Sequence, residues 1–253
     1  TTLFRSLCDD AYVSATRLVQ VALGVAGVAL GVLAYQAQVD NLAEPLTTEA
    51  RAMASVGAAW AFLVAGLVAW VRRPANRMGP LMILTCFALL ARQLRFSHDP
   101  LAFTTFFLLG EVAYVLVGHV TLAYPTGRVT DRLERLFLKV AYPVALLFPL
   151  AVLLVYDGSR QLKYFDDSAR ESLLLLTGQP DLVAPIQDVF AVGAYGALAT
   201  VFVALVVRTR RPFFRSRPGR PLLATSTFLA AVTLALPYTP LARPLGLAPL
   251  PGT

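Results

Sequence analysis

Two ionisable residues, Glu111 and His119, lie within one long apolar stretch of the chain. They are eight residues apart, a little over two turns of an α-helix, so both project toward roughly one face. An ionisable group in a membrane span is by default a functional-site hypothesis, because hydrocarbon does not solvate charge. The pair therefore predicts a polar intramembrane site that senses protons or a ligand. The plainer alternative is that each side chain bonds to a neighbouring helix.

Motifs of catalytic chemistry are absent from the sequence. It contains no phosphate-binding loop, zinc motif, nucleophile elbow or dinucleotide fingerprint. The histidines are His98 and His119 and the cysteines are Cys8 and Cys86, which leaves no spacing suited to a metal site or a catalytic triad. We therefore expect no catalytic residue, metal or cofactor in this chain.

Basic residues gather in short segments between the apolar stretches. Such segments are attracted to the anionic cytoplasmic leaflet, by about 1 kcal/mol per basic residue. A plain electrostatic anchor is favoured over specific recognition of one lipid. The net charge of +7 does not indicate binding to nucleic acid, because no basic helix or aromatic-basic groove is present. The predicted anchor residues are Arg72, Arg73, Arg77, Arg128, Arg208, Arg210, Arg211, Arg215, Arg217 and Arg220.

The composition indicates that these residues belong to a membrane protein. Hydrophobic residues make up 57% of the chain and charged residues 15%, against roughly 25% charged in ordinary globular domains. The apolar runs are continuous, unlike the amphipathic stripes of soluble bundles or the alternating segments of β-barrels. We predict an all-α, polytopic transmembrane helical bundle of about seven spans in the plasma membrane. The predicted spans cover residues 18–35, 52–71, 78–94, 101–124, 138–156, 186–207 and 222–241.

Local patterns within these spans carry further expectations. Gly27 and Gly31 form a small-xxx-small pattern that permits close helix approach, although glycine is also simply common in membrane helices. Arg92 and Arg95, at the outer end of the third span, are expected to extend toward the lipid headgroups. An ion pair with Glu111 is the other arrangement open to them, but no sequence pattern supports it.

The distribution of Lys and Arg predicts the orientation. With a cytoplasmic N-terminus, 15 of the 22 basic residues fall on the cytoplasmic side and 7 on the other, and the richer side is normally cytoplasmic. An odd number of spans then leaves Arg243 outside. The longest outer loop, residues 157–185, is too short for a globular sensor domain. Within it we expect residues 173–176 to dip into the membrane interface as a short helix.

Two motifs flank the loops on the predicted cytoplasmic side. The first is RRPANRMGPL at residues 72–81, and the second is HVTLAYPTGR at residues 119–128. In the second, Pro125 stops a helix and Gly127 permits the turn that follows. In order, spacing and surrounding helices they resemble the "RRPxNRxG" and "HLLLAFPxGR" segments in the membrane sensor regions of actinobacterial two-component histidine kinases. The resemblance extends over roughly residues 17–241, and His119 falls on a motif position.

The resemblance implies a membrane-embedded signal-input module of a sensor histidine kinase, acting in phosphorelay signal transduction. The kinase core is missing from this fragment; it would bind ATP and Mg²⁺, form a homodimer and act on a cognate response regulator. Residues 1–16 would be an N-terminal cytoplasmic stub, 17–242 the transmembrane sensor region and 243–253 the start of a truncated continuation. Residues 1–6, TTLFRS, read like a translated sequencing adaptor and are set aside.

Other classes of membrane protein remain open from the sequence. A transporter or channel-like protein would have discontinuous helices and internal repeats, and spans 1–3 show no obvious similarity to spans 4–6. A membrane-bound enzyme would need more intramembrane polar residues than Glu111 and His119. The same membrane module attached to a different output, such as a cyclase, is the third alternative, which the sequence after Thr253 would decide.

Overall fold

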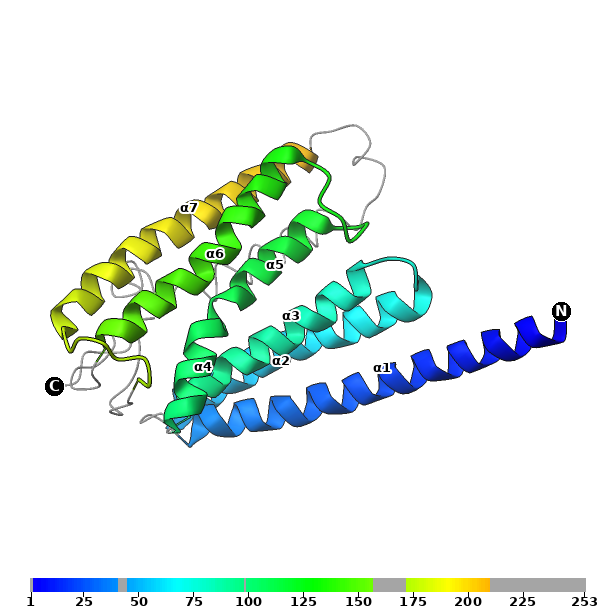
Figure 1. Ribbon diagram of the computed structural model, residues 1–253, viewed down its shortest axis with the longest axis horizontal. Coiled ribbons are helices and arrows are strands. Elements are labelled where there is room, and N and C mark those ends of the chain that lie inside the picture. The colour runs from blue at the N-terminus through cyan, green and yellow to red at the C-terminus, as the bar shows by residue number, and fades with distance from the viewer. Residues whose placement is uncertain (1, 41–44, 98, 157–171, 210–253) are drawn as a thin grey trace.

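The described part of the chain is built of helices joined by turns and loops. The computed structural model describes residues 2–40, 45–97, 99–156 and 172–209, and these contain helices and no β-strand, which confirms the all-α prediction (Figure 1). The α-helices are α1 (Thr2–Val39), α2 (Pro45–Arg72), α3 (Met78–Gln93), α4 (Pro100–Gly110), α5 (Val112–Ala123), α6 (Arg132–Val155) and α7 (Val183–Thr209). Two 3₁₀ helices, η1 (Leu94–Phe96) and η2 (Pro180–Leu182), precede α4 and α7.

Five helical stretches are long and apolar enough to cross a membrane. They are Thr16–Val39, Ala52–Arg72, Met78–Phe96, Pro100–Ala123 and Arg132–Val155, and they correspond to the first five predicted spans. Their length and composition indicate a membrane protein. The sixth predicted span lies within α7, whereas the seventh, residues 222–241, lies outside the described residues.

Several helices begin earlier than the predicted spans, among them α1 and α6. α1 starts at Thr2, so residues 2–16 of the predicted stub are helical. α6 starts at Arg132 because Asp131 caps it: the Asp131 carboxylate accepts a hydrogen bond of 2.9 Å from the Leu133 N–H. These polar ends lengthen the helices without extending the apolar runs from which the spans were predicted.

The helices alternate in direction, so their connections gather at two ends of the bundle. Figure 1 shows the N-terminal end of α1, the α2–α3 turn, the α5–α6 turn and the C-terminal end of α7 at one end. The C-terminal ends of α1, α3 and α6 and the N-terminal ends of α2, α4 and α7 lie at the other end. The first two basic segments, around Arg72 and Arg128, therefore share one end of the bundle, as the predicted alternation of spans requires.

The Gly27–Gly31 pattern lies where α1 meets α2. A Cβ atom at Gly27 would lie 2.5 Å from Leu63 Cδ2, and one at Gly31 would collide with the indole of Trp60. The Trp60 indole N–H donates a hydrogen bond of 3.1 Å to the Gly27 carbonyl oxygen. The two glycines thus permit close helix packing, and the interpretation of this pattern as a packing motif is confirmed.

α3 lies at the centre of the bundle and packs against α1, α2, α4 and α5. Its buried apolar side chains, among them Ile83 and Leu90, share one core with Leu63 of α2 and Val117 of α5. α1 and α6 instead expose many apolar side chains, such as Val25. Exposed apolar surface on the outer helices is what a lipid-facing bundle requires, because lipid tails solvate it.

The segment before α7 covers one end of α6. The N–H groups of Leu176 and Thr177 donate to the Leu154 carbonyl oxygen, and the Leu173 N–H donates to Thr104 Oγ1 at 3.1 Å. Residues 173–176 form turns rather than the predicted short helix, because their backbone bonds to α4 and α6 instead of to itself. Their leucine side chains remain exposed.

We expect Gly31→Ala to destabilise the bundle by about 1–3 kcal/mol, since the added methyl overpacks the α1–α2 contact. Denaturant titration in mixed micelles, followed by circular dichroism, measures the loss. Gly57→Ala is the matched control: it makes the same change in α2, and its Cβ meets no atom within 4 Å. Equal stability of the two variants would contradict the α1–α2 packing.

Candidate functional site

The fourth predicted span, residues 101–124, is interrupted at Glu111. This residue ends α4 and precedes α5, and the Tyr114 N–H donates to the Glu111 carbonyl oxygen, three residues back rather than four. The interruption contains no proline but follows Gly110, and glycine is a usual site of helix bending. The α-helical ladder is therefore broken next to an ionisable side chain, and α4 and α5 lie at an angle to each other in Figure 1.

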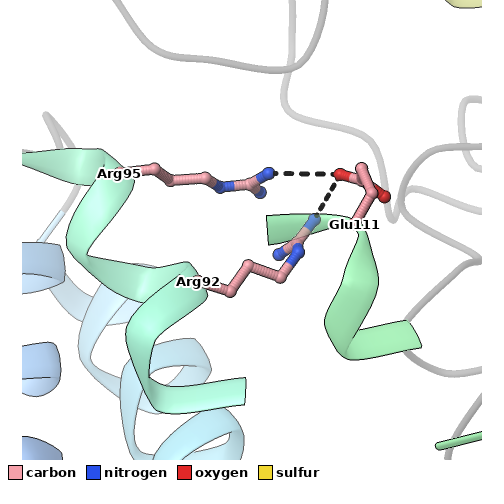
Figure 2. A network of polar contacts seen from close by, with 3 residues as sticks. All are labelled: Arg92, Arg95 and Glu111. Carbon is pink, nitrogen blue, oxygen red and sulfur yellow. Dashed lines mark hydrogen bonds and ion pairs between the residues drawn. The ribbon is translucent and has the colours of Figure 1, made fainter. Parts of the chain in front are cut away.

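Two arginines converge on the Glu111 carboxylate from α3 and η1, as Figure 2 shows. Arg92 Nη2 lies 3.5 Å and Arg95 Nη1 3.6 Å from Glu111 Oε1. The side chains of Arg92, Arg95 and Glu111 are 7%, 4% and 16% exposed. We call these three residues the ion cluster.

The ion cluster overturns one prediction. Arg92 and Arg95 do not extend toward headgroups; both are buried and turn into the bundle. A charge buried in protein is tolerated when it is paired, and the broken fourth span supplies the carboxylate. The prediction was based on the position of Arg92 and Arg95 near the end of a span. That position does not determine whether their side chains point into the bundle or toward lipid.

Neighbouring groups complete the surroundings of the ion cluster. The guanidinium carbon of Arg92 lies 4.4 Å from the centre of the Tyr114 ring, and that of Arg95 lies 5.3 Å from the centre of the Phe96 ring. Both are within the range of cation–π attraction. A Cβ at Gly110 would lie 3.1 Å from Arg92 Cγ, so the glycine leaves room for the arginine stem. Charge and packing together fix α3 against the α4–α5 break.

His119 has a different partner from Glu111. Its Nδ1 atom lies 2.9 Å from the Tyr142 hydroxyl, and the two rings meet edge to face, which links α5 to α6. Glu111 contacts α3 and η1 instead. The two residues therefore do not form one paired site; each bonds to a neighbouring helix, which is the plainer of the two arrangements expected from the sequence.

The two sequence motifs meet at the other end of α5. The Asn76 side-chain amide donates to the Pro125 carbonyl oxygen at 2.9 Å, and the Asn76 Oδ1 atom accepts from the Met78 N–H at 3.0 Å. Gly127 has φ of +71°, which favours glycine, and a Cβ there would lie 2.7 Å from the Arg77 carbonyl carbon. We call residues 76–78 and 125–127 the motif joint.

A second glycine contact continues the motif joint into the bundle. A Cβ at Gly79 would lie 2.7 Å from Trp70 Cβ, and one at Gly66 would lie 2.9 Å from the Gly79 carbonyl oxygen. The backbones of α2 and α3 are therefore almost in contact beside the turn that joins them. Asn76, Gly79 and Gly127 together hold α2, α3 and α5 at one end.

The predicted anchor arginines are only partly described by the structure. Arg72, Arg73, Arg77 and Arg128 are exposed at the end of the bundle that carries the motif joint. Arg208 lies in the last turn of α7. The remaining anchor residues, Arg210, Arg211, Arg215, Arg217 and Arg220, lie outside the described residues.

Four residues with clear contacts are not among the site residues predicted from the sequence: Asn76, Tyr142, Arg92 and Arg95. Asn76 and Tyr142 carry no individual signal, because an asparagine in a turn and a tyrosine in a span are both ordinary. Arg95 could have been found, since Arg92 and Arg95 are three residues apart on one helical face and the next span contains a lone glutamate. Opposite charges in consecutive spans are a pairing signal.

Comparisons with known proteins do not identify the chain. No protein-family model, curated protein or solved structure matches it. The geometry above and the two motifs are therefore what indicates a function.

We expect Glu111→Gln to cost about 3 kcal/mol or more of stability, because it leaves two buried guanidinium groups without their shared carboxylate. Unfolding in mixed micelles measures the loss. The double change Glu111→Gln with Arg95→Gln removes one of the two cations and should recover part of it.

Asp40→Asn serves as the control for this change. It makes the same carboxylate-to-amide substitution at an exposed position after α1 and should alter stability by less than about 0.5 kcal/mol. If Glu111→Gln were as mild as Asp40→Asn, the ion cluster would not contribute to stability.

Proposed function

We propose that this chain is the membrane-embedded signal-input module of a sensor histidine kinase in the plasma membrane. The ATP- and Mg²⁺-binding kinase core, the homodimer and the cognate response regulator belong to the parent protein. In this role the bundle detects a membrane or extracytoplasmic cue and passes a change of helix arrangement to the kinase.

The contact between the two motifs is the observation that carries the proposal. Residues 72–81 and 119–128 each resemble a segment of the kinase family, and Asn76 of the first bonds to Pro125 of the second. Gly127 of the second motif also touches the backbone of Arg77 in the first. Two short matches that build one contact are better support for the resemblance than two independent matches in an apolar background.

The ion cluster lies at the point where this module can change its helix arrangement. Glu111 lies at the α4–α5 break, so α4 and α5 can change their angle there more readily than a continuous helix could. Its pairing with Arg92 and Arg95 favours one angle. A cue that weakens the pairing would shift the population toward another arrangement, and α3 and α5 would carry the change to the motif joint.

The proposal sets a condition on topology. If α7 spans the membrane like the helices before it, the chain returns at Thr209 to the side of its N-terminus. A further span at residues 222–241 would take it across again, so a cytoplasmic kinase core requires one more crossing after that span. The gene sequence after the codon for Thr253 tests both points: it should encode that crossing, then a phospho-accepting histidine and an ATP site. A cyclase or transport domain there would overturn the proposal.

In the complete protein we expect Glu111→Gln to change autophosphorylation by about fivefold or more, the lower end of typical coupling between sites. Proteoliposomes with radiolabelled ATP give the rate, and Asp40→Asn is the control. His119→Ala, measured across pH together with Glu111→Gln, tests proton sensing. Identical pH profiles of the unsubstituted protein, His119→Ala and Glu111→Gln would contradict proton sensing. An unchanged autophosphorylation rate in Glu111→Gln would contradict a role of the ion cluster in signalling.

One observation favours a second candidate, a transporter or channel-like protein. Discontinuous helices with charged residues at the break are a feature of transporter binding sites, and the α4–α5 break at Glu111 has this character. Flux of a radiolabelled anion into vesicles containing this chain alone would favour the transporter. Vesicles no more permeable than protein-free ones favour the input module.

A further inference from the structure

We infer that the motif joint builds a binding surface for the headgroup of an anionic phospholipid, with Arg77 and Arg128 as its two basic contacts. The inference goes beyond the proposed function and does not depend on it, because a sensor and a transporter would use such a surface alike. The plain anchor expected from the sequence would attract anionic lipid through charge alone. At the surface inferred here, the arrangement of the two arginines would also set the affinity for the lipid.

The position of the surface fits a lipid headgroup. Two candidate spans end at Arg72 and Ala123, and the next two begin at Met78 and Arg132. The connecting residues 73–77 and 124–131 therefore lie at the level where hydrocarbon gives way to headgroups, whichever side of the membrane they face. Trp70 and Tyr124 lie at the same level, where amphipathic aromatic residues are favoured.

The motif joint brings together two basic residues that are far apart in the sequence. A Cβ at Gly127 would lie 3.0 Å from Arg77 Cα, so Arg128 follows a residue that touches the backbone of Arg77. Both arginine side chains are exposed. The Asn76–Pro125 hydrogen bond of 2.9 Å fixes the two loops against each other. The backbones that carry these two exposed arginines are therefore held close together.

The charge balance favours an anionic partner. Over residues 72–77 and 124–139 the basic residues are Arg72, Arg73, Arg77, Arg128, Arg132, Arg135 and Lys139, and the acidic ones are Asp131 and Glu134. Asp131 is engaged as the cap of α6, and the Arg135 guanidinium donates to the Asp131 carbonyl oxygen at 3.4 Å. A guanidinium pair matches the oxygens of a phosphate, which it can bind through several hydrogen bonds.

The test uses the whole chain in detergent micelles and native mass spectrometry. Each variant is titrated with phosphatidylglycerol, with zwitterionic phosphatidylcholine as the reference lipid. Arg77→Gln with Arg128→Gln should lower the affinity for phosphatidylglycerol about 25-fold, near fivefold for each charge removed. Arg132→Gln with Arg135→Gln removes the same charge from the same end of the bundle but leaves the motif joint and Arg128 intact, so it should lower the affinity less.

Asn76→Ala separates geometry from charge, because it keeps every arginine and removes the side-chain bonds of Asn76 to the Pro125 carbonyl oxygen and the Met78 N–H. We expect it to lower the affinity for phosphatidylglycerol by about threefold or more, the loss of roughly one hydrogen bond. Arg77→Lys with Arg128→Lys is the second test of geometry, for use even if Asn76→Ala is poorly folded. It keeps the charge but loses the planar fork, and should also weaken binding.

Three results would overturn the inference. The first is equal loss of affinity in the two double Gln variants, which would reduce the surface to summed charge. The second is full affinity in Asn76→Ala together with full affinity in the double Lys variant. The third is displacement of the lipid by millimolar inorganic phosphate, which would mean that the site takes a soluble anion instead.

Discussion

A guanidinium group inside a bilayer needs an anion close by, and this requirement organises the middle of the bundle. Arg92 and Arg95 bring two positive charges into the interior, and Glu111 meets them at distances of 3.5 and 3.6 Å. To do so the fourth span bends at Gly110 and Glu111, and the central helix α3 is fixed against the bend. The discontinuity in the fold and its most buried charges therefore have one common cause.

Close backbone approach is the second organising feature, and it acts between α1 and α2 and between α2 and α3. Gly27 and Gly31 admit Leu63 and Trp60 between α1 and α2, while Gly66 and Gly79 bring α2 against α3. Helices that associate in lipid gain little stability from the hydrophobic effect. Close packing and hydrogen bonds, such as the one from the Trp60 indole N–H to the Gly27 carbonyl oxygen, stabilise their association instead. The motif joint extends this arrangement into the loops, where Asn76 bonds to Pro125.

The amino-acid composition was sufficient to predict where the membrane spans lie. It was insufficient to predict which way the side chains of those spans point. Continuous apolar runs located the first five spans, and the spacing of Gly27 and Gly31 identified a real helix contact. Neither signal says which way a side chain points, so Arg92 and Arg95 were expected near headgroups and Glu111 was paired with His119. Contacts between distant segments, such as His119 with Tyr142, arise only when helices pack, and a single sequence carries no record of that packing.

The charge content of α3 also bears on how the protein enters the membrane. Its candidate span has a mean hydropathy of 1.2, against 1.8 to 2.2 for the four others, and it contains both arginines of the ion cluster. Released alone into lipid, it would carry two cations with no anion to meet them, and each such residue opposes insertion. Glu111 is synthesised later, so α3 gains its counter-charge only when the following span emerges. Pairing with Glu111 would offset the cost of these two charges once the following span is inserted.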